Sequence, residues 1–151
     1  MKIRKYKESD KEKILQLSSR LNEFEFLNYR DIESMNKIQL ELAMKSILDN
    51  SKNIFVAEKN EKFLGYLEMA KEKDYFTGKE VAYISSIIVA TDSVGTGVGK
   101  ALINKAEEWS IMNDCTELVL DVFKGNKNAI EFYEHFGFEE EIVKMVKSVI
   151  K

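Results

Sequence analysis

Apolar positions recur along the chain with two different spacings, and each spacing predicts a different kind of element. Apolar residues three or four positions apart predict a helix, whereas alternation or a short continuous apolar run predicts a strand. A first strand is expected at about residues 2–6, followed by two helices. The first helix begins at a Ser9–Glu12 capping box. Its apolar residues at helical spacing are Ile14, Leu17, Leu21 and Phe24.

The middle of the chain changes from the helical period to that of strands. The second helix carries Met35, Ile38, Leu42, Met44, Ile47 and Leu48. Residues 54–57 and 63–67 are short apolar runs joined by a polar turn at residues 59–62, which predicts a hairpin. Residues 81–90 form a longer β-branched run that is apolar on both faces. Such a run is expected inside a sheet rather than at its edge.

The second half of the chain alternates helices and strands. An amphipathic helix has Val98, Leu102, Ala106 and Trp109 on one face. A buried strand is expected at residues 118–122 and a short helix at 128–136, with Gly137 as its C-cap glycine. Residues 138–150 alternate well enough for one or two final strands. The order β-α-α-β-β-β-α-β-α-β predicts a mixed α/β fold, with residues 1–151 as a single domain.

Composition narrows the class of protein. The 151 residues are 44% hydrophobic and 32% charged, as in globular soluble domains. The net charge of −3, with basic residues widely scattered, argues against a nucleic-acid partner. The apolar runs are too short to cross a bilayer and the N-terminus lacks a signal-peptide core, so a cytoplasmic protein with no membrane partner is expected. The single Cys115 and single His135 suggest no metal site, and neither is assigned a role.

A glycine-rich turn separates the long β-branched strand from the amphipathic helix. Residues 94–100 read Val-Gly-Thr-Gly-Val-Gly-Lys. Glycines let the backbone approach a ligand closely, and the helix that follows offers unpaired N–H groups and the positive end of its dipole. A phosphate or pyrophosphate would fit this turn; a plain strand-to-helix turn is the alternative.

Two common phosphate-binding motifs do not match this turn. A P-loop requires glycine where Val94 stands and a hydroxyl residue where Ala101 follows Lys100. The Rossmann fingerprint, Gly-x-Gly-x-x-Gly, opens the first β-α-β unit. Here Gly-x-Gly-x-Gly follows several strands. A nucleotide-binding module of either kind therefore has little support.

Two spaced motifs together resemble those of the GNAT superfamily of acetyl-CoA-dependent N-acetyltransferases. The family's signature Gln/Arg-x-x-Gly-x-Gly/Ala after a long apolar strand is matched by residues 94–99, although Val94 replaces the usual Gln or Arg. A second family segment is matched by Asn126-Lys127-Asn128-Ala129, Phe132-Tyr133 and Gly137-Phe138. The resemblance runs from Ile3 to the C-terminus; within the superfamily, the ribosomal-protein N-acetyltransferases are resembled only loosely. It implies a central mixed sheet of about six to seven strands flanked by four helices.

The resemblance also implies where acetyl-CoA would bind, with no metal. The strand end at Ile87, Ile88 and Val89 would pair with the pantetheine arm, and the N–H of Val89 would stabilise the oxyanion, a contribution of roughly 3 kcal/mol. The remaining implied cofactor-binding residues are Val94, Gly95, Thr96, Gly97, Val98, Gly99, Lys100, Asn126, Asn128, Ala129 and Tyr133.

Tyr133 is the implied general acid. A phenol with a reference pKa of about 10 stays protonated at neutral pH and can donate to the sulfur of CoA. The alternative is a core aromatic residue, because Tyr133 shares a helical face with Ala129 and Phe136.

The general base is less clearly marked. Ser85 and Ser86 stand where some family members carry a glutamate. Asp121 is the first candidate, because it lies in an otherwise apolar strand five residues before Asn126; the alternatives are a solvent-facing strand residue and a helix-capping partner. Glu68 is the second candidate, and a water chain with no dedicated base is a third arrangement.

The acceptor is expected to be a primary amine of a small molecule, peptide or protein. Its site would lie between the first two helices and the strand ends, where acidic and aromatic residues suit a cation. These residues are Glu23, Phe24, Glu25, Phe26, Tyr29, Asp31 and Glu33; in the alternative reading, the phenylalanines are core and the acids are solvated.

The resemblance also raises the expectation of a homodimer. The competing hypothesis is a CoA-binding regulatory module without turnover, favoured by Val94 and opposed by Asn126 and Tyr133.

Overall fold

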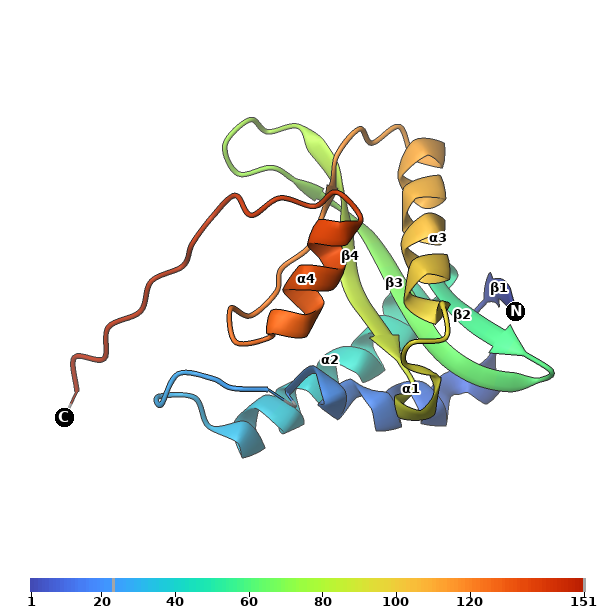
Figure 1. The fold of residues 1–151 in the computed structure, drawn as a ribbon, viewed down its shortest axis with the longest axis horizontal. Coiled ribbons are helices and arrows are strands. Elements are labelled where there is room, and N and C mark those ends of the chain that lie inside the picture. Colours follow the sequence, from blue (N-terminus) through green and yellow to red (C-terminus); the bar gives the residue numbers. More distant parts are fainter. Residues whose placement is uncertain (23, 151) are drawn as a thin grey trace.

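A computed structural model describes residues 1–22 and 24–150 and shows a five-stranded sheet between two helical layers (Figure 1). Across the sheet the strands are β1 (Lys2–Lys5), β2 (Ile54–Lys59), β3 (Lys62–Lys73), β4 (Glu80–Val89) and β5 (Leu118–Val119). The pairs from β1 to β4 are antiparallel, and β5 is parallel to β4. The helices are α1 (Lys11–Leu17), α2 (Ile32–Asn50), α3 (Val98–Met112) and α4 (Lys127–His135). Glu23 and the side chain of Leu21 lie outside the described part.

Each face of the sheet is covered by its own pair of helices. Successive side chains of a strand point to opposite faces. Leu67 of β3 accordingly packs in a core cluster with Leu102 of α3, against which the aromatic residues of α4 also lie. Its neighbour Tyr66 packs in a second cluster with Ile14 of α1 and Ile47 of α2. Within the described ranges, no helix combines the length and apolar content needed to cross a membrane.

The predicted fold class is confirmed, but the expected number of strands was too high. The described residues form a mixed α/β arrangement with four α-helices, and β4 lies inside the sheet as its apolar faces predicted. Residues 139–150 form no strand, and β5 has two residues instead of the five expected at 118–122. An alternating pattern gives strand propensity, but a strand also needs a neighbour, and the segment that follows α4 runs away from the sheet (Figure 1).

The prediction of a Ser9 capping box is wrong. Ser9 lies within a short 3-10 helix, Glu8–Asp10, and α1 begins after it at Lys11. The side chain of Asp10 instead accepts a hydrogen bond from the backbone N–H of Lys7 at 2.8 Å. The first helix is also shorter than expected, because it continues after Leu17 as a 3-10 helix, Ser18–Asn22.

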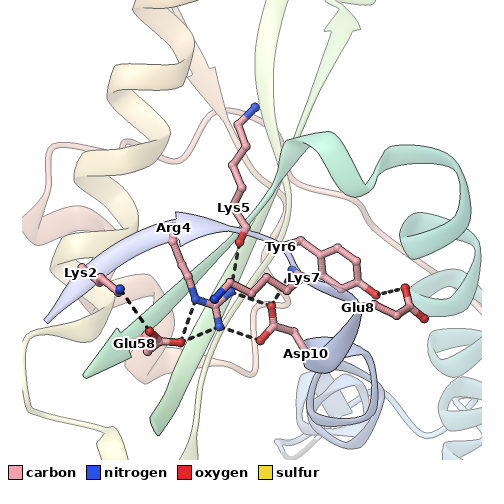
Figure 2. A network of polar contacts seen from close by, with 8 residues as sticks. All are labelled: Lys2, Arg4, Lys5, Tyr6, Lys7, Glu8, Asp10 and Glu58. Carbon is pink, nitrogen blue, oxygen red and sulfur yellow. Dashed lines mark hydrogen bonds and ion pairs between the residues drawn. The ribbon is translucent and has the colours of Figure 1, made fainter. Parts of the chain in front are cut away.

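Arg4 connects the first strand to both the second strand and this turn (Figure 2). Its guanidinium donates to the two carboxylate oxygens of Asp10 at 2.8 and 2.9 Å and to Glu58 Oε2 at 2.8 Å. Burial alone would raise the pKa of Asp10, but the hydrogen bonds from Arg4 and from Lys7 N–H outweigh it, and the pKa falls below its ordinary value. The hydrogen bond from Arg4 likewise lowers the pKa of Glu58. Both carboxylates are therefore held in their charged forms.

Candidate active site

The glycine-rich turn borders open space at the start of α3. Gly95 and Gly97 have φ of +79° and +88°, values that glycine adopts without steric cost. A Cβ atom at either position would meet nothing within 4 Å. The first turn of α3, which begins at Val98, leaves its N–H groups without partners inside the helix and lies at the positive end of the dipole. An anionic group such as a pyrophosphate fits this arrangement.

Gly99 has a packing role that the other two glycines lack. A Cβ atom at position 99 would lie 2.9 Å from the tip of the Phe132 ring on α4. The absence of a side chain therefore lets α4 pack directly against the first turn of α3. Tyr133, the next residue of α4, is held in the same core cluster.

Strands β4 and β5 separate after two residue pairs. Ala82 pairs with Leu118 and Tyr83 with Val119. In the described part of the chain, residues 84–89 of β4 have no strand neighbour on the side of β5. The free stretch of β4, residues 84–89, can therefore pair with an extended ligand.

Val89 is the last residue of this free stretch, and its backbone N–H points to the side of β4 from which β5 has separated. The next residue, Ala90, donates its N–H to Leu64 O on β3 at 2.8 Å. Because adjacent residues of an antiparallel strand direct their N–H groups to opposite sides, the N–H of Val89 points away from β3. Its carbonyl accepts a hydrogen bond from Arg20, from the segment between α1 and α2. The sequence analysis had not singled out Arg20.

Tyr133 is half-buried on the face of the sheet covered by α3 and α4. Its ring lies 5.5 Å from that of Phe132 and 5.6 Å from that of Phe138, measured between centroids. Burial raises the pKa of Tyr133 to about 12, so the phenol stays protonated at neutral pH. Helix α4 is fixed at both ends: Asn126 Oδ1 accepts from Ala129 N at 3.3 Å, and Gly137 has φ of +90°. The prediction of a C-cap glycine is thus confirmed.

A cavity of about 170 Å³ lies between the α1–α2 layer and the opposite face of the sheet. Glu68, Ser85 and Ser86 line it together with Gln39 of α2. Glu68 is only 6% exposed, and its carboxylate accepts a hydrogen bond from Asn50 Nδ2 at 2.9 Å. A buried carboxylate at the floor of a cavity is a natural partner for a cation. The structure thus brings Glu68, the second candidate for the general base, together with Ser85 and Ser86 of β4.

Asp121 is exposed and hydrogen-bonded to Tyr83, whose phenol donates to Asp121 Oδ2 at 2.7 Å. Burial and this hydrogen bond raise the pKa of Tyr83 above its ordinary value. Tyr83 alternates along β4 with Ala82 and Ile84, which face α3. Tyr83 therefore points to the α1–α2 face, the face on which Glu68 lies.

The segment before α2 packs on the segment after β5. The rings of Phe24, Phe26 and Phe123 form a cluster with centroid separations of 4.8 to 5.9 Å. The guanidinium of Arg30 lies 5.5 Å from the ring of Phe123. Phe24 and Phe26 are thus half-buried against each other and Phe123 rather than within either core cluster. The expected acceptor residues that remain exposed are Glu25, Tyr29, Asp31 and Glu33.

A second, more open hollow of about 340 Å³ adjoins this aromatic cluster. Tyr29, Asp31 and Phe123 line it, and Gln39 lines both this hollow and the cavity of Glu68. The two spaces therefore share one lining residue of α2. Sequence reasoning missed Phe123, although an aromatic residue directly after the strand expected at 118–122 is a usable signal. It also missed Asn50 and Tyr83, which carry no distinguishing local pattern.

Comparison with known proteins agrees with this arrangement. The sequence model of the acetyltransferase (GNAT) family matches residues 12–138. An uncharacterized N-acetyltransferase of Methanocaldococcus jannaschii is 42% identical over 103 residues, which cover 63% of this chain and 45% of that protein. The spermidine N(1)-acetyltransferase of Vibrio cholerae is 33% identical over 112 residues, which cover 72% of this chain and 61% of that enzyme. The chain thus spans only about half to three fifths of the length of these relatives.

A similar fold occurs among solved structures. A proposed acetyl transferase from Pyrococcus furiosus superposes with a TM-score of 0.77 and 28% sequence identity. The match covers 98% of this chain and 99% of that protein.

Proposed function

The chain belongs to the acetyltransferase (GNAT) family, and we propose that it transfers the acetyl group of acetyl-CoA to a primary amine of a small, elongated cationic molecule. The observation that carries this proposal is the buried Glu68 carboxylate, which lines a cavity together with Ser85 and Ser86 of β4. The Glu68 carboxylate supplies negative charge beside β4, and the free stretch of β4 is available to pair with the extended arm of a thioester cosubstrate.

The residues present fit acetyl-CoA. When bound, this cosubstrate supplies an activated acyl group as a thioester. The open backbone at Gly95 and Gly97 and the first turn of α3 would hold its pyrophosphate. The free stretch of β4 would pair with the pantetheine arm through the backbone of residues 87–89. Val94 is 61% exposed and apolar, so it adds no polar contact to this site.

The chemistry assigns one task to each part of the site. The reaction forms an amide N–C bond, breaks the thioester C–S bond, takes a proton from the amine and leaves a thiolate that needs one. The Val89 N–H stabilises the oxyanion. Tyr133 donates from its phenol to the sulfur, and Glu68 accepts the proton of the amine. Asp121, held by Tyr83, supplies a second negative charge on the same face.

The shape of the acceptor side favours an elongated amine. The cavity of Glu68 and the hollow of Asp31 share Gln39 as a lining residue, and a linear molecule that reached across Gln39 would place one cationic group near each carboxylate. The name of the Vibrio cholerae relative, a spermidine N(1)-acetyltransferase, agrees with such an acceptor.

Two measurements test the proposal in sequence. Calorimetric titration with acetyl-CoA, with ATP and NAD as controls, is expected to show selective micromolar binding, weakened in a Gly97→Ala variant. Release of CoA thiol is then followed with linear polyamines, an aminoglycoside and a lysine peptide, and linear polyamines are expected to be the best acceptors. Binding without turnover for any amine would make the protein a CoA-binding module, and no binding would overturn the acetyltransferase assignment.

A further inference from the structure

A chain of three side-chain hydrogen bonds runs from helix α3 to the Glu68 carboxylate. Trp109 Nε1 of α3 donates to Asn53 Oδ1 at 3.2 Å, and Asn53 Nδ2 donates to Asn50 Oδ1 at 2.7 Å. Asn50 Nδ2 then donates to Glu68 Oε2 at 2.9 Å. Asn50 is the last residue of α2, and Asn53 ends the 3-10 helix Ser51–Asn53 that leads into β2. The chain therefore connects the helix that follows the glycine-rich turn with the proposed general base.

The chemistry of its two ends fixes the direction of this hydrogen-bond chain. An indole N–H can only donate, and an ionised carboxylate can only accept. Each asparagine amide must therefore turn its oxygen toward Trp109 and its nitrogen toward Glu68. The Asn50 amide also donates to Met69 O at 3.0 Å, so both of its N–H groups are used. Reversing that amide would bring its oxygen against two other acceptors, and one orientation of Asn50 is thereby selected.

The Asn50 amide ties Glu68 to the backbone at an irregular point of the sheet. The register between β3 and β4 shifts between Glu68 and Met69, so regular strand pairing alone does not fix the chain there. Leu67 and Met69 pack in the core cluster with α3, whereas Glu68 lines the cavity on the opposite face. By donating to both Glu68 Oε2 and Met69 O, the amide holds the carboxylate at a set position relative to the strand.

The surroundings of Glu68 offer no competing charge within its cavity. Among the described residues that line the cavity, Tyr66 is the other titratable side chain. Burial raises the pKa of Tyr66 above its ordinary value, so its phenol is neutral at neutral pH. Asp121 lies on the same face of the sheet, but it is exposed. A buried carboxylate needs hydrogen-bond donors in place of its lost hydration, and the Asn50 amide supplies one.

We propose that Asn50, Asn53 and Trp109 are positioning residues that hold the Glu68 carboxylate in place for the incoming amine. This inference rests on the proposed function, in which Glu68 accepts the proton of the amine. A general base must lie within hydrogen-bonding reach of the proton it removes, and a displacement of about 1 Å can cost on the order of 100-fold in rate. Helix α3 would thus serve both substrates, with the pyrophosphate at its first turn and Trp109 in its last.

The indole N–H of Trp109 gives a test that needs no turnover. Trp109 is the single tryptophan of the chain, so its indole gives one signal in a proton–nitrogen NMR spectrum. Protonation makes the Glu68 carboxyl group a weaker acceptor, and hydrogen bonds in a chain polarise one another. The indole signal is therefore expected to shift as Glu68 titrates in acid. This step should be absent in Glu68→Gln and in Asn53→Ala, which interrupts the chain.

Asn113→Ala is the matched control for the NMR titration. The side chain of Asn113 donates to Trp109 O at 2.8 Å, so it contacts the same residue without belonging to the chain. Its loss should leave the titration step of the indole signal in place.

Double-mutant kinetics separate positioning from general damage to the fold. Asn53→Ala and Trp109→Phe should each lower kcat about tenfold while KM for acetyl-CoA changes less than about threefold. In a Glu68→Gln background neither substitution should lower kcat further, because the base that they orient is gone. Asn113→Ala should keep the wild-type kcat in both backgrounds.

Asn50→Asp adds a test by charge. The variant keeps the shape of the side chain but places a second carboxylate beside Glu68, in the position of the two N–H donors. Repulsion between like charges should move the acidic limb of kcat/KM to higher pH by about one unit or more. An acidic limb at the wild-type pH would contradict the contact between Asn50 and the base.

The outcomes distinguish this inference from the proposed function. An indole titration step that survives Glu68→Gln or Asn53→Ala overturns the positioning role, and so do losses of kcat that add in full to that of Glu68→Gln. If the indole step follows Glu68 but Glu68→Gln retains wild-type kcat/KM, Glu68 is not the base. That result overturns the catalytic assignment and the positioning role together, although the hydrogen-bond chain itself would stand.

Discussion

Gly99, in the first turn of α3, faces the tip of the Phe132 ring so closely that a Cβ atom would lie 2.9 Å from it. Because Phe132 precedes Tyr133 on α4, this contact sets how closely the proposed general acid approaches the glycine-rich turn. The third glycine of the motif therefore serves the packing of two helices, whereas Gly95 and Gly97 leave backbone open to a ligand.

Replacing Gly99 by alanine is expected to disturb catalysis more than the fold. The ring tip of Phe132 can shift to make room, so the loss of stability should be limited to about 1–2 kcal/mol. The shift moves Tyr133, and kcat should fall about tenfold. The matched control is Gly78→Ala, where φ is +70° and a Cβ would meet nothing within 4 Å. This control should also lose about 1 kcal/mol but keep kcat; an equal loss of kcat in both variants would contradict the packing role.

Tyr133→Phe tests the general acid. Loss of the phenol should lower kcat about 100-fold while the affinity for acetyl-CoA changes less than about threefold, because a proton donor acts mainly in the transition state. Steady-state kinetics and calorimetry on the same preparation separate the two effects. Tyr75→Phe is the control, since Tyr75 is 92% exposed. An unchanged kcat with intact binding would leave Tyr133 as a core aromatic residue.

The roles of the two carboxylates can be separated by their pH–rate profiles. Glu68→Gln keeps an oxygen that can accept the hydrogen bond from Asn50, so the cavity should retain its shape. If Glu68 is the base, kcat/KM should fall about 100-fold and its acidic limb should disappear. Asp121→Asn should then weaken binding of the amine but keep that limb. The reverse result would move the base to Asp121, and a limb unchanged in both variants would favour a water chain.

The sequence predicted those elements whose apolar residues pack against other elements of the same chain. Helix α3 buries Val98, Leu102, Ala106 and Trp109 as its spacing indicated, and β4 lies inside the sheet. Residues 120–122 and 138–150 have the same kind of local signal but find no strand neighbour in the described part of the chain. Their pairing depends on what lies beside them, which a single-sequence pattern does not contain.

The sequence predicted which residue types take part in the candidate site, but not how these residues are arranged in space. The glycine-rich turn and Tyr133 follow from motifs, and their proposed roles stay predictions. The burial of Glu68 arises because the end of α2 brings Asn50 against β3, 18 residues away in sequence. The hydrogen bond between Tyr83 and Asp121 joins residues 38 apart. Contacts of this range depend on the packed fold and have no local sequence signal.

The Arg4 network is expected to give the fold a dependence on acid pH. Asp10 and Glu58 have pKa values below their ordinary range in the folded protein. A carboxylate with a lowered pKa contributes stability above its unfolded pKa of about 4, and that stability is lost as the pH falls through the folded value. Thermal melts followed by circular dichroism should therefore show Tm falling as the pH drops below about 4.5.

Arg4→Met shows how much of that stability the network contributes. Without the guanidinium, Asp10 keeps only its backbone donor at Lys7 and remains in a buried position, so Tm at pH 7 should fall by roughly 5 to 10 °C. The fall of Tm with acid should also become shallower, because the carboxylates are then closer to their unfolded pKa values. Lys62→Met is the matched control: it removes an ion pair with Asp92 whose side chains are 58% and 62% exposed, and Tm should change by less than about 2 °C. A variant at Arg4 with wild-type Tm and wild-type acid dependence would mean that this network contributes no stability, and that the packing of β1 against β2 alone positions the first helix.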